Sequence, residues 1–164
     1  MKVSFIGHSE VSNRDEVKQR LRNLLFAWIA TENADTFLFG SRGDFNALGY
    51  EVVSELKNDF PHIRRVYVRA EFEYTTAEYD RYLSTEYEES FFPESVRNAG
   101  KAAYVKRNRV MIDMYDRLLV YFDENYAPQR RASGTRIAVE YARQKRKPIY
   151  NVQEAEQYAI RNPS

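Results

Sequence analysis

The chain has 164 residues, of which 43% are hydrophobic and 30% charged, and a formal net charge of +1, as in an ordinary single-domain globular protein. It contains no cysteine and only two histidines, which excludes disulfides, a thiol nucleophile, thiolate metal centres and a three-histidine metal site. Binding of a hard cation by carboxylates stays open but has no motif behind it, so we predict no metal site, and the sequence implies no cofactor. No apolar run approaches the roughly 20 residues of a membrane span, and the N-terminal apolar stretch is too short for a signal peptide. We expect a cytoplasmic protein with no membrane partner.

Charge is unevenly distributed along the chain. Residues 66–100 hold three arginines against eight acidic residues, whereas residues 101–147 hold twelve basic residues against five acidic ones. The first segment suits an acidic lid or contact face, and the second favours an anionic ligand. Because the basic residues alternate with apolar helix positions and form no long stripe, the pattern argues against nucleic-acid binding.

Short apolar runs alternate with longer stretches of helical periodicity in chain order. The runs predict strands at residues 3–7, 36–39, 65–69, 118–122 and 148–152. Helical spacing and capping residues predict helices beginning near residues 12, 44, 101 and 133, with a weak helix at the C-terminus. Residues 70–100 are acidic, rich in Tyr and Phe and without a clean period, and are interpreted as an excursion or lid.

This alternation, with connections long enough for crossovers, predicts one α/β domain over residues 1–164. The expected architecture is a three-layer Rossmann-like fold with a mainly parallel sheet of about five strands and helices on both faces. Ligands of such sheets bind beyond the carboxyl ends of the strands, near the point where strand order reverses. The segments that follow the strands are therefore the candidate ligand-binding residues.

Gly7 and His8 follow the first strand, where His8 would either donate a hydrogen bond to a phosphate or carbonyl, or cap the next helix. The second strand runs into Gly40, Ser41, Arg42, Gly43 and Asp44. Glycines admit a close backbone approach, a helix start presents free N–H groups to an anion, and Arg42 adds a charged donor. The alternative is a plain turn in which Asp44 caps the helix.

Arg107 falls in the middle of the apolar stripe of its helix, among Ala103, Val110, Met111 and Met114. A guanidinium on the core face needs a partner or a ligand, because burying an unpaired charge is costly. The competing interpretation is a side chain that reaches solvent at the sheet edge or pairs with a structural acid.

Ser133, Gly134 and Thr135 begin the helix after the fourth strand, beyond Asp123. Two hydroxyls, a glycine and exposed N–H groups at a helix N-terminus suit a phosphate. Ser133 as an ordinary N-cap residue is the alternative.

These segments together resemble the SLOG superfamily, the Rossmann-like group that includes the LOG-type cytokinin phosphoribohydrolases, and most closely a bacterial branch akin to the YspA- and YpsA-type proteins. The residues that carry the resemblance are Phe5 to His8, Phe37 to Phe45, Glu51 to Val53, Tyr104 to Asn108, Met111, Asp116, Ser133 to Thr135 and Glu140 to Ala142. The resemblance implies a nucleotide site that includes Arg107 and Asn108. In the LOG-type enzymes an arginine and a glutamate form the catalytic pair, and Arg107 matches that arginine, while Glu140 lies further beyond Thr135 than the glutamate does.

The leading hypothesis is a protein that binds or senses a nucleotide or nucleotide-derived phosphate ligand, with a tyrosine from residues 70–92, such as Tyr74 or Tyr79, over the base. The alternative is an N-glycosidic hydrolase of nucleoside monophosphates, with Arg107 orienting the ribose or phosphate and Glu140 or Asp123 stabilising the oxocarbenium-like charge. A third interpretation is an interaction module recognised through Glu86, Glu88 and Glu89. The resemblance and the 13 tyrosines and 10 phenylalanines are compatible with a homodimer.

Overall fold

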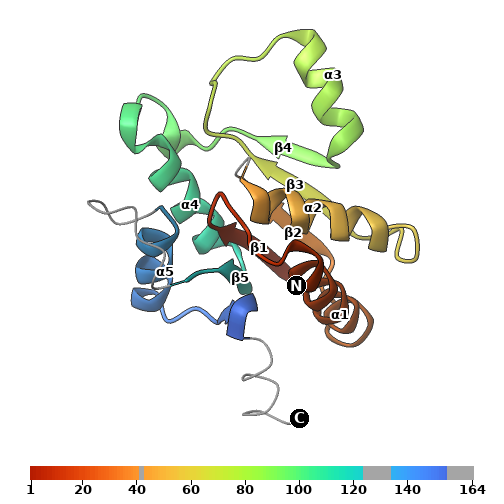
Figure 1. The fold of residues 1–164 in the computed structure, drawn as a ribbon. Coiled ribbons are helices and arrows are strands. Elements are labelled where there is room, and N and C mark those ends of the chain that lie inside the picture. The colour runs from red at the N-terminus through yellow and green to blue at the C-terminus, as the bar shows by residue number, and fades with distance from the viewer. Residues whose placement is uncertain (41–42, 124–133, 155–164) are drawn as a thin grey trace.

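A six-stranded, all-parallel sheet forms the centre of the computed structural model, which describes residues 1–40, 43–123 and 134–154 (Figure 1). The strand order is β4-β3-β2-β1-β5-β6. The strands are β1 (Lys2–Gly7), β2 (Thr36–Phe39), β3 (Arg64–Val68), β4 (Glu89–Phe91), β5 (Arg117–Tyr121) and β6 (Ile149–Asn151). The helices are α1 (Arg14–Glu32), α2 (Asp44–Leu56), α3 (Ala77–Glu86), α4 (Ala103–Met114) and α5 (Gly134–Gln144). The predicted α/β architecture is therefore confirmed.

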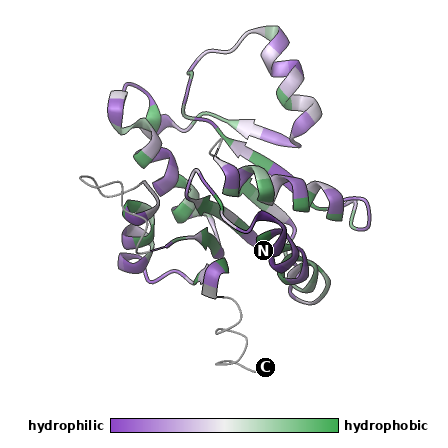
Figure 2. Cartoon of the chain, in the orientation of Figure 1, coloured by the Kyte–Doolittle hydropathy of each residue, from purple (hydrophilic) through white to green (hydrophobic). Residues whose placement is uncertain are grey.

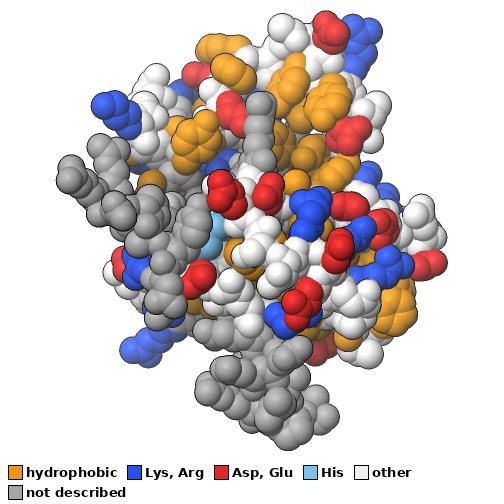
Figure 3. Space-filling view, in the orientation of Figure 1, with side chains coloured by type: hydrophobic (Ala, Val, Ile, Leu, Met, Phe, Trp, Pro, Cys, Tyr) orange, Lys and Arg blue, Asp and Glu red, His pale blue; other side chains and the backbone are white. Residues whose placement is uncertain are grey.

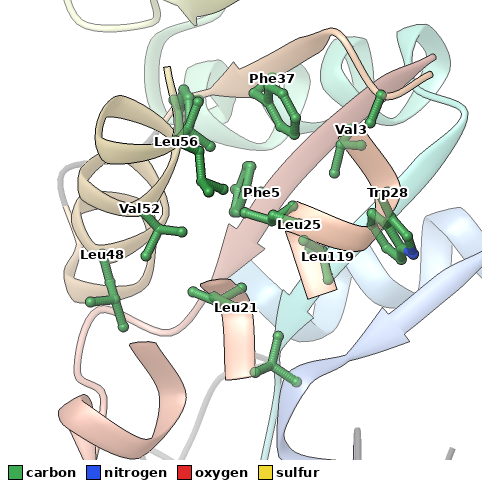
Figure 4. Close-up of a cluster of buried hydrophobic side chains, with 14 of the residues drawn as sticks. Val3, Phe5, Leu21, Leu25, Trp28, Phe37, Leu48, Val52, Leu56 and Leu119 are labelled. Carbon is green, nitrogen blue, oxygen red and sulfur yellow. The ribbon is translucent and has the colours of Figure 1, made fainter. Parts of the chain in front are cut away.

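Side chains of the central strands alternate between two separate cores, as the period-two geometry of a strand requires. Val3 and Phe5 of β1 pack with α1 and α2, whereas Ile6 packs on the opposite face with α4 and α5. Figure 4 shows the first core, with Phe5 of β1 among side chains of the neighbouring helices. In the same core the Phe5 and Phe39 rings are stacked with centroids 4.8 Å apart. Figure 2 shows the same division as hydrophobic strands between helices that are hydrophilic on their outer surfaces.

The excursion at residues 70–100 contains two elements that the sequence analysis did not predict. Helix α3 buries only Leu83 among its ten residues, and β4 adds three residues to the sheet edge beside β3. So short a strand and so narrow an apolar face leave no clear period in the sequence. The excursion extends the main sheet, and Figure 1 shows α3 standing apart from the other helices, above β3 and β4.

Strand order reverses between β1 and β5, because the chain leaves β1 toward β2 and β3 on one side and returns to β5 and β6 on the other. Because all six strands are parallel, their carboxyl ends lie at one edge of the sheet. We call this edge the upper edge. Helix α4 runs down into β5, so that its N-terminal half, with Arg107, lies toward the upper edge, and α5 begins there directly after β5. Arg107 on α4 and the start of α5, two segments of the predicted phosphate site, therefore lie at the same edge of the sheet.

None of the helices in the described part of the chain is long and apolar enough to cross a membrane.

Candidate functional site

His8, which is 3% exposed, links the carboxyl ends of the paired strands β1 and β5. Its backbone N–H donates to the Tyr121 carbonyl at 3.2 Å, and its Nε2 accepts the Asp123 backbone N–H at 3.0 Å. Burial lowers the pKa of the His8 imidazole, against the raising effect of Asp123. A neutral ring is required here, because Nε2 must keep its lone pair to accept the amide hydrogen. The hydrogen bond of Nε2 therefore connects the ends of β1 and β5, where the strand order reverses.

Gly7 is needed for packing. A Cβ built on Gly7 would lie 2.5 Å from a ring carbon of Phe45, in the first turn of α2. Asp44, beside Phe45, does not cap its own helix: its backbone N–H donates to the Ser9 carbonyl at 2.8 Å, and its Oδ2 accepts the Val11 N–H at 3.2 Å. The start of α2, where Gly43 is the N-cap residue, is therefore bound to the loop that follows β1.

Two of the predicted site residues, Arg107 and Gly40, are in direct contact. A Cβ on Gly40 would lie 2.6 Å from Arg107 Cδ and 2.5 Å from Met111 Sδ, so the missing side chain makes room for the arginine. Asn108 accepts a 3.0 Å hydrogen bond from Arg107 Nε. The Arg107 guanidinium is thereby fixed against the carboxyl end of β2.

The Arg107 side chain is 3% exposed, and its Nη1 has no hydrogen-bond partner among the described residues. Burial lowers the pKa of Arg107, against the raising effects of Tyr67 and then Glu71. Arginine nevertheless remains charged in proteins, so this is a buried cation with a donor left over. Such a group is normally paired or engaged by a ligand.

A cavity of about 360 Å³ lies between α2, α3 and the ends of β2 and β3, and Arg107 is not among the residues that line it. We call it the tyrosine cavity. It is lined by Phe39, Asn46, Ala47, Tyr50, Tyr67, Tyr79, Tyr82, Leu83, Glu86 and Tyr87. Figure 3 shows hydrophobic side chains, among which tyrosine is counted, gathered around α3 and the sheet below it.

The tyrosine cavity is connected to Arg107 and its contacts Gly40, Asn108 and Met111. Asn46, a wall residue, accepts the Gly40 N–H through Oδ1 at 3.2 Å, and Gly40 contacts Arg107. Tyr67, another wall residue, lies close enough to Arg107 to influence its pKa and is 3.3 Å from Glu71 Oε2 through its hydroxyl. The upper edge therefore has a buried cationic group and an aromatic cavity that are linked through Gly40 and Asn46.

Several predicted site residues lie elsewhere or outside the described residues. Ser41, Arg42 and Ser133 are in the latter group. Gly134 begins α5 with open space around it, since a Cβ there meets no described atom within 4 Å, and Thr135 is buried. Glu140, the proposed catalytic partner of Arg107, is exposed on α5.

Residue-level reasoning missed Asn46 and Glu86 as possible ligand contacts. Asn46 is a buried polar residue next to Phe45 in an apolar helix face, and that mismatch was a usable signal. Glu86 was singled out only as part of an acidic protein-contact segment, because one acidic residue among many in an aperiodic segment does not indicate a ligand contact. Tyr79 does line the cavity, whereas Tyr74 is 85% exposed.

The acidic segment is largely engaged within the molecule. Glu88 pairs with Arg65 at 2.8 Å, Glu89 with Arg64 at 3.1 Å, and Glu73 with Arg97 at 2.6 Å. These pairs reduce the charge available to a partner protein. Among the described residues, no group of three or more His, Asp and Glu side chains is arranged to hold a metal ion.

A scan of the chain against models of known protein families found no match, and a search of curated proteins found no significant relative.

Proposed function

We propose that the chain binds a nucleotide or a nucleotide-derived phosphate ligand at the upper edge of the sheet. The observation that carries the proposal is the buried Arg107 guanidinium, with Nη1 unpaired among the described residues, linked through Gly40 and Asn46 to a cavity lined by five tyrosines. Guanidinium groups bind phosphate by charge-assisted hydrogen bonds, and aromatic rings stack on bases. The resemblance to the SLOG superfamily points to the same ligand class.

The size of the site agrees with this ligand class. A volume of about 360 Å³ is within the usual range of small-molecule pockets, roughly 300–1,000 Å³. The phosphate would contact Arg107 and the Gly40 backbone, and the base would enter the tyrosine cavity. The helix start at Gly134 lies at the same edge, and a further phosphate would bind there.

Binding is favoured over N-glycosidic hydrolysis because Glu140, one of the two carboxylates proposed to stabilise the oxocarbenium-like charge, is exposed on α5. A carboxylate in solvent gains little from a low-dielectric site and is poorly placed to stabilise an oxocarbenium-like charge. A sensor or binding protein needs no such group.

Titration calorimetry with GMP, AMP, CMP, UMP and inorganic phosphate tests the proposal. At least one nucleotide is expected to bind, and Arg107→Met to weaken that binding by about tenfold or more, because a charge-assisted phosphate contact is lost. Arg109→Met is the matched control, since Arg109 is exposed on the same helix and stacks on Tyr141, away from the cavity. Chromatography of the same mixtures should show no free base.

Unfolding of the variant is separated from loss of the site by a denaturant titration. Arg107 makes no salt bridge with any described residue, so replacing this buried cation with an apolar side chain of similar volume is expected to leave the free energy of unfolding unchanged or raised. Equal nucleotide affinity in the wild type and in Arg107→Met, or no binding of any nucleotide at millimolar concentration, would contradict the proposal. Release of free base would support the hydrolase instead.

A further inference from the structure

Glu86 is the one acidic side chain in the wall of the tyrosine cavity, among the described residues. It is the last residue of α3, so the helix sets the position of its backbone. The other walls are aromatic, aliphatic or amide-bearing, and flat rings on several sides suit a flat heteroaromatic ligand. The cavity thus combines stacking surfaces with a single strong hydrogen-bond acceptor.

The Glu86 carboxylate is held in place by Tyr50. The Tyr50 hydroxyl lies 2.7 Å from Glu86 Oε2 and 2.8 Å from the Glu86 main-chain oxygen, and it donates to this pair of acceptors. Burial, followed by the hydrogen bond to Glu86, raises the pKa of Tyr50 to about 12, so the phenol keeps its proton at neutral pH. Arg65, in turn, donates to the Tyr50 oxygen at 3.4 Å and to Ser54 Oγ at 3.1 Å.

In this arrangement one oxygen of the Glu86 carboxylate is hydrogen-bonded, and the other is available to a ligand. Among the described residues, Oε2 of Glu86 accepts a hydrogen bond from Tyr50, whereas Oε1 has no hydrogen-bond partner. An ionised carboxylate only accepts hydrogen bonds, and it binds best to a ligand that presents two donors side by side. The preferred ligand therefore carries adjacent N–H groups on a flat ring.

Among the common bases, guanine has this edge, with N1–H beside the 2-amino group. Adenine presents an acceptor, N1, next to its amino group, and uracil has a single ring N–H between two carbonyls. Building on the proposed function, we infer that the site selects guanine nucleotides, with the base stacked in the tyrosine cavity and its N1–H and 2-amino groups read by Glu86.

Calorimetry with GMP, IMP and AMP tests the inference, because these nucleotides differ only on the edge in question. IMP keeps N1–H but lacks the 2-amino group, and AMP has neither ring donor. Hydrogen bonds to charged groups support a discrimination of roughly 10- to 100-fold between GMP and AMP, with IMP between them. Guanosine without phosphate is expected to keep the preference for guanine but to lose the contribution of Arg107.

Glu86→Gln supplies the decisive variant. A glutamine oxygen still accepts the Tyr50 hydrogen, so the fold is preserved, but the other carboxylate oxygen is replaced by an NH2 group, which donates and cannot accept a hydrogen from guanine. GMP affinity should fall by about tenfold while AMP affinity changes little. Glu78→Gln is the matched control, since Glu78 is exposed on the same helix and does not line the cavity.

The inference and the proposed function fail in different ways. Equal affinities for GMP, IMP and AMP, all lost in Arg107→Met, would overturn guanine selection and leave nucleotide binding intact. A preference for GMP that survives unchanged in Glu86→Gln would overturn the role of Glu86. A thermal melt identical to that of the wild type shows that Glu86→Gln is folded; if it is not, the GMP-to-AMP ratio of the wild type alone decides the question.

Discussion

His8 accepts the Asp123 amide hydrogen through Nε2, so its protonation state bears directly on the joint between β1 and β5. Sequence patterns indicated that His8 lies beyond the first strand but left its role open between ligand contact and helix cap. The ring does neither with Nε2. It bonds to a residue 115 positions away, which no local pattern reveals.

Acidification is expected to destabilise the protein through His8. Burial lowers the pKa of His8 in the folded protein below its ordinary value of 6.5. Just below pH 6.5 the unfolded chain therefore binds a proton at His8 that the folded protein does not bind. The free energy of unfolding should therefore be highest above about pH 6.5 and fall as the pH drops below that value. Urea titrations between pH 7.5 and pH 5 measure the slope.

Two single variants identify the group responsible for that slope. His8→Gln removes the titrating group and should give a flatter profile between pH 7 and pH 5 than the wild type. His62→Gln, at an exposed position between α2 and β3, should keep the wild-type slope. A slope unchanged in His8→Gln would assign the pH dependence to other residues.

At the scale of elements, the central part of the fold was predictable and its edge was not. β1 and β2 are buried runs whose ends match the sequence prediction closely, since apolar residues there face both cores. β4 could not be predicted, because one exposed and two half-buried residues at a sheet edge carry no periodic signal. The candidate site divides in the same way. Arg107 was predicted from its place on an apolar stripe, whereas Glu86 depends on how α3 packs over the sheet.

The contact between β1 and α2 gives a prediction at this scale. In Gly7→Ala the new Cβ would lie 2.5 Å from the Phe45 ring, so the start of α2 must shift. Overpacking of this kind costs about 1–3 kcal/mol of the free energy of unfolding, which a denaturant titration measures. Gly134→Ala is the control: its Cβ meets no described atom within 4 Å, and a change below roughly 0.5 kcal/mol is expected. Equal losses in the two variants would mean that the close packing at Gly7 has no energetic weight.

The whole molecule combines a well-packed centre with a lightly attached wall of the candidate site. β1 and β5 lie between two cores, with Phe5 and Leu119 fully buried. Helix α3 buries Leu83 alone and connects to a three-residue edge strand. Because local opening requires little loss of apolar contact there, α3 should open far more readily than the central strands.

Hydrogen exchange measured by mass spectrometry tests this division and its link to ligand binding. In the free protein, amides of α3 should exchange at least about a hundredfold faster than those of β1 and β5. A saturating nucleotide in the tyrosine cavity would contact Tyr79 and Glu86 of α3 and so slow exchange in that helix, because a ligand that binds only the closed form lowers the population of the open one. Inorganic phosphate, which on this proposal would bind Arg107 without filling the aromatic cavity, should protect α3 much less. Equal protection of α3 by phosphate and by nucleotide, or protection confined to α5, would place the base outside the tyrosine cavity.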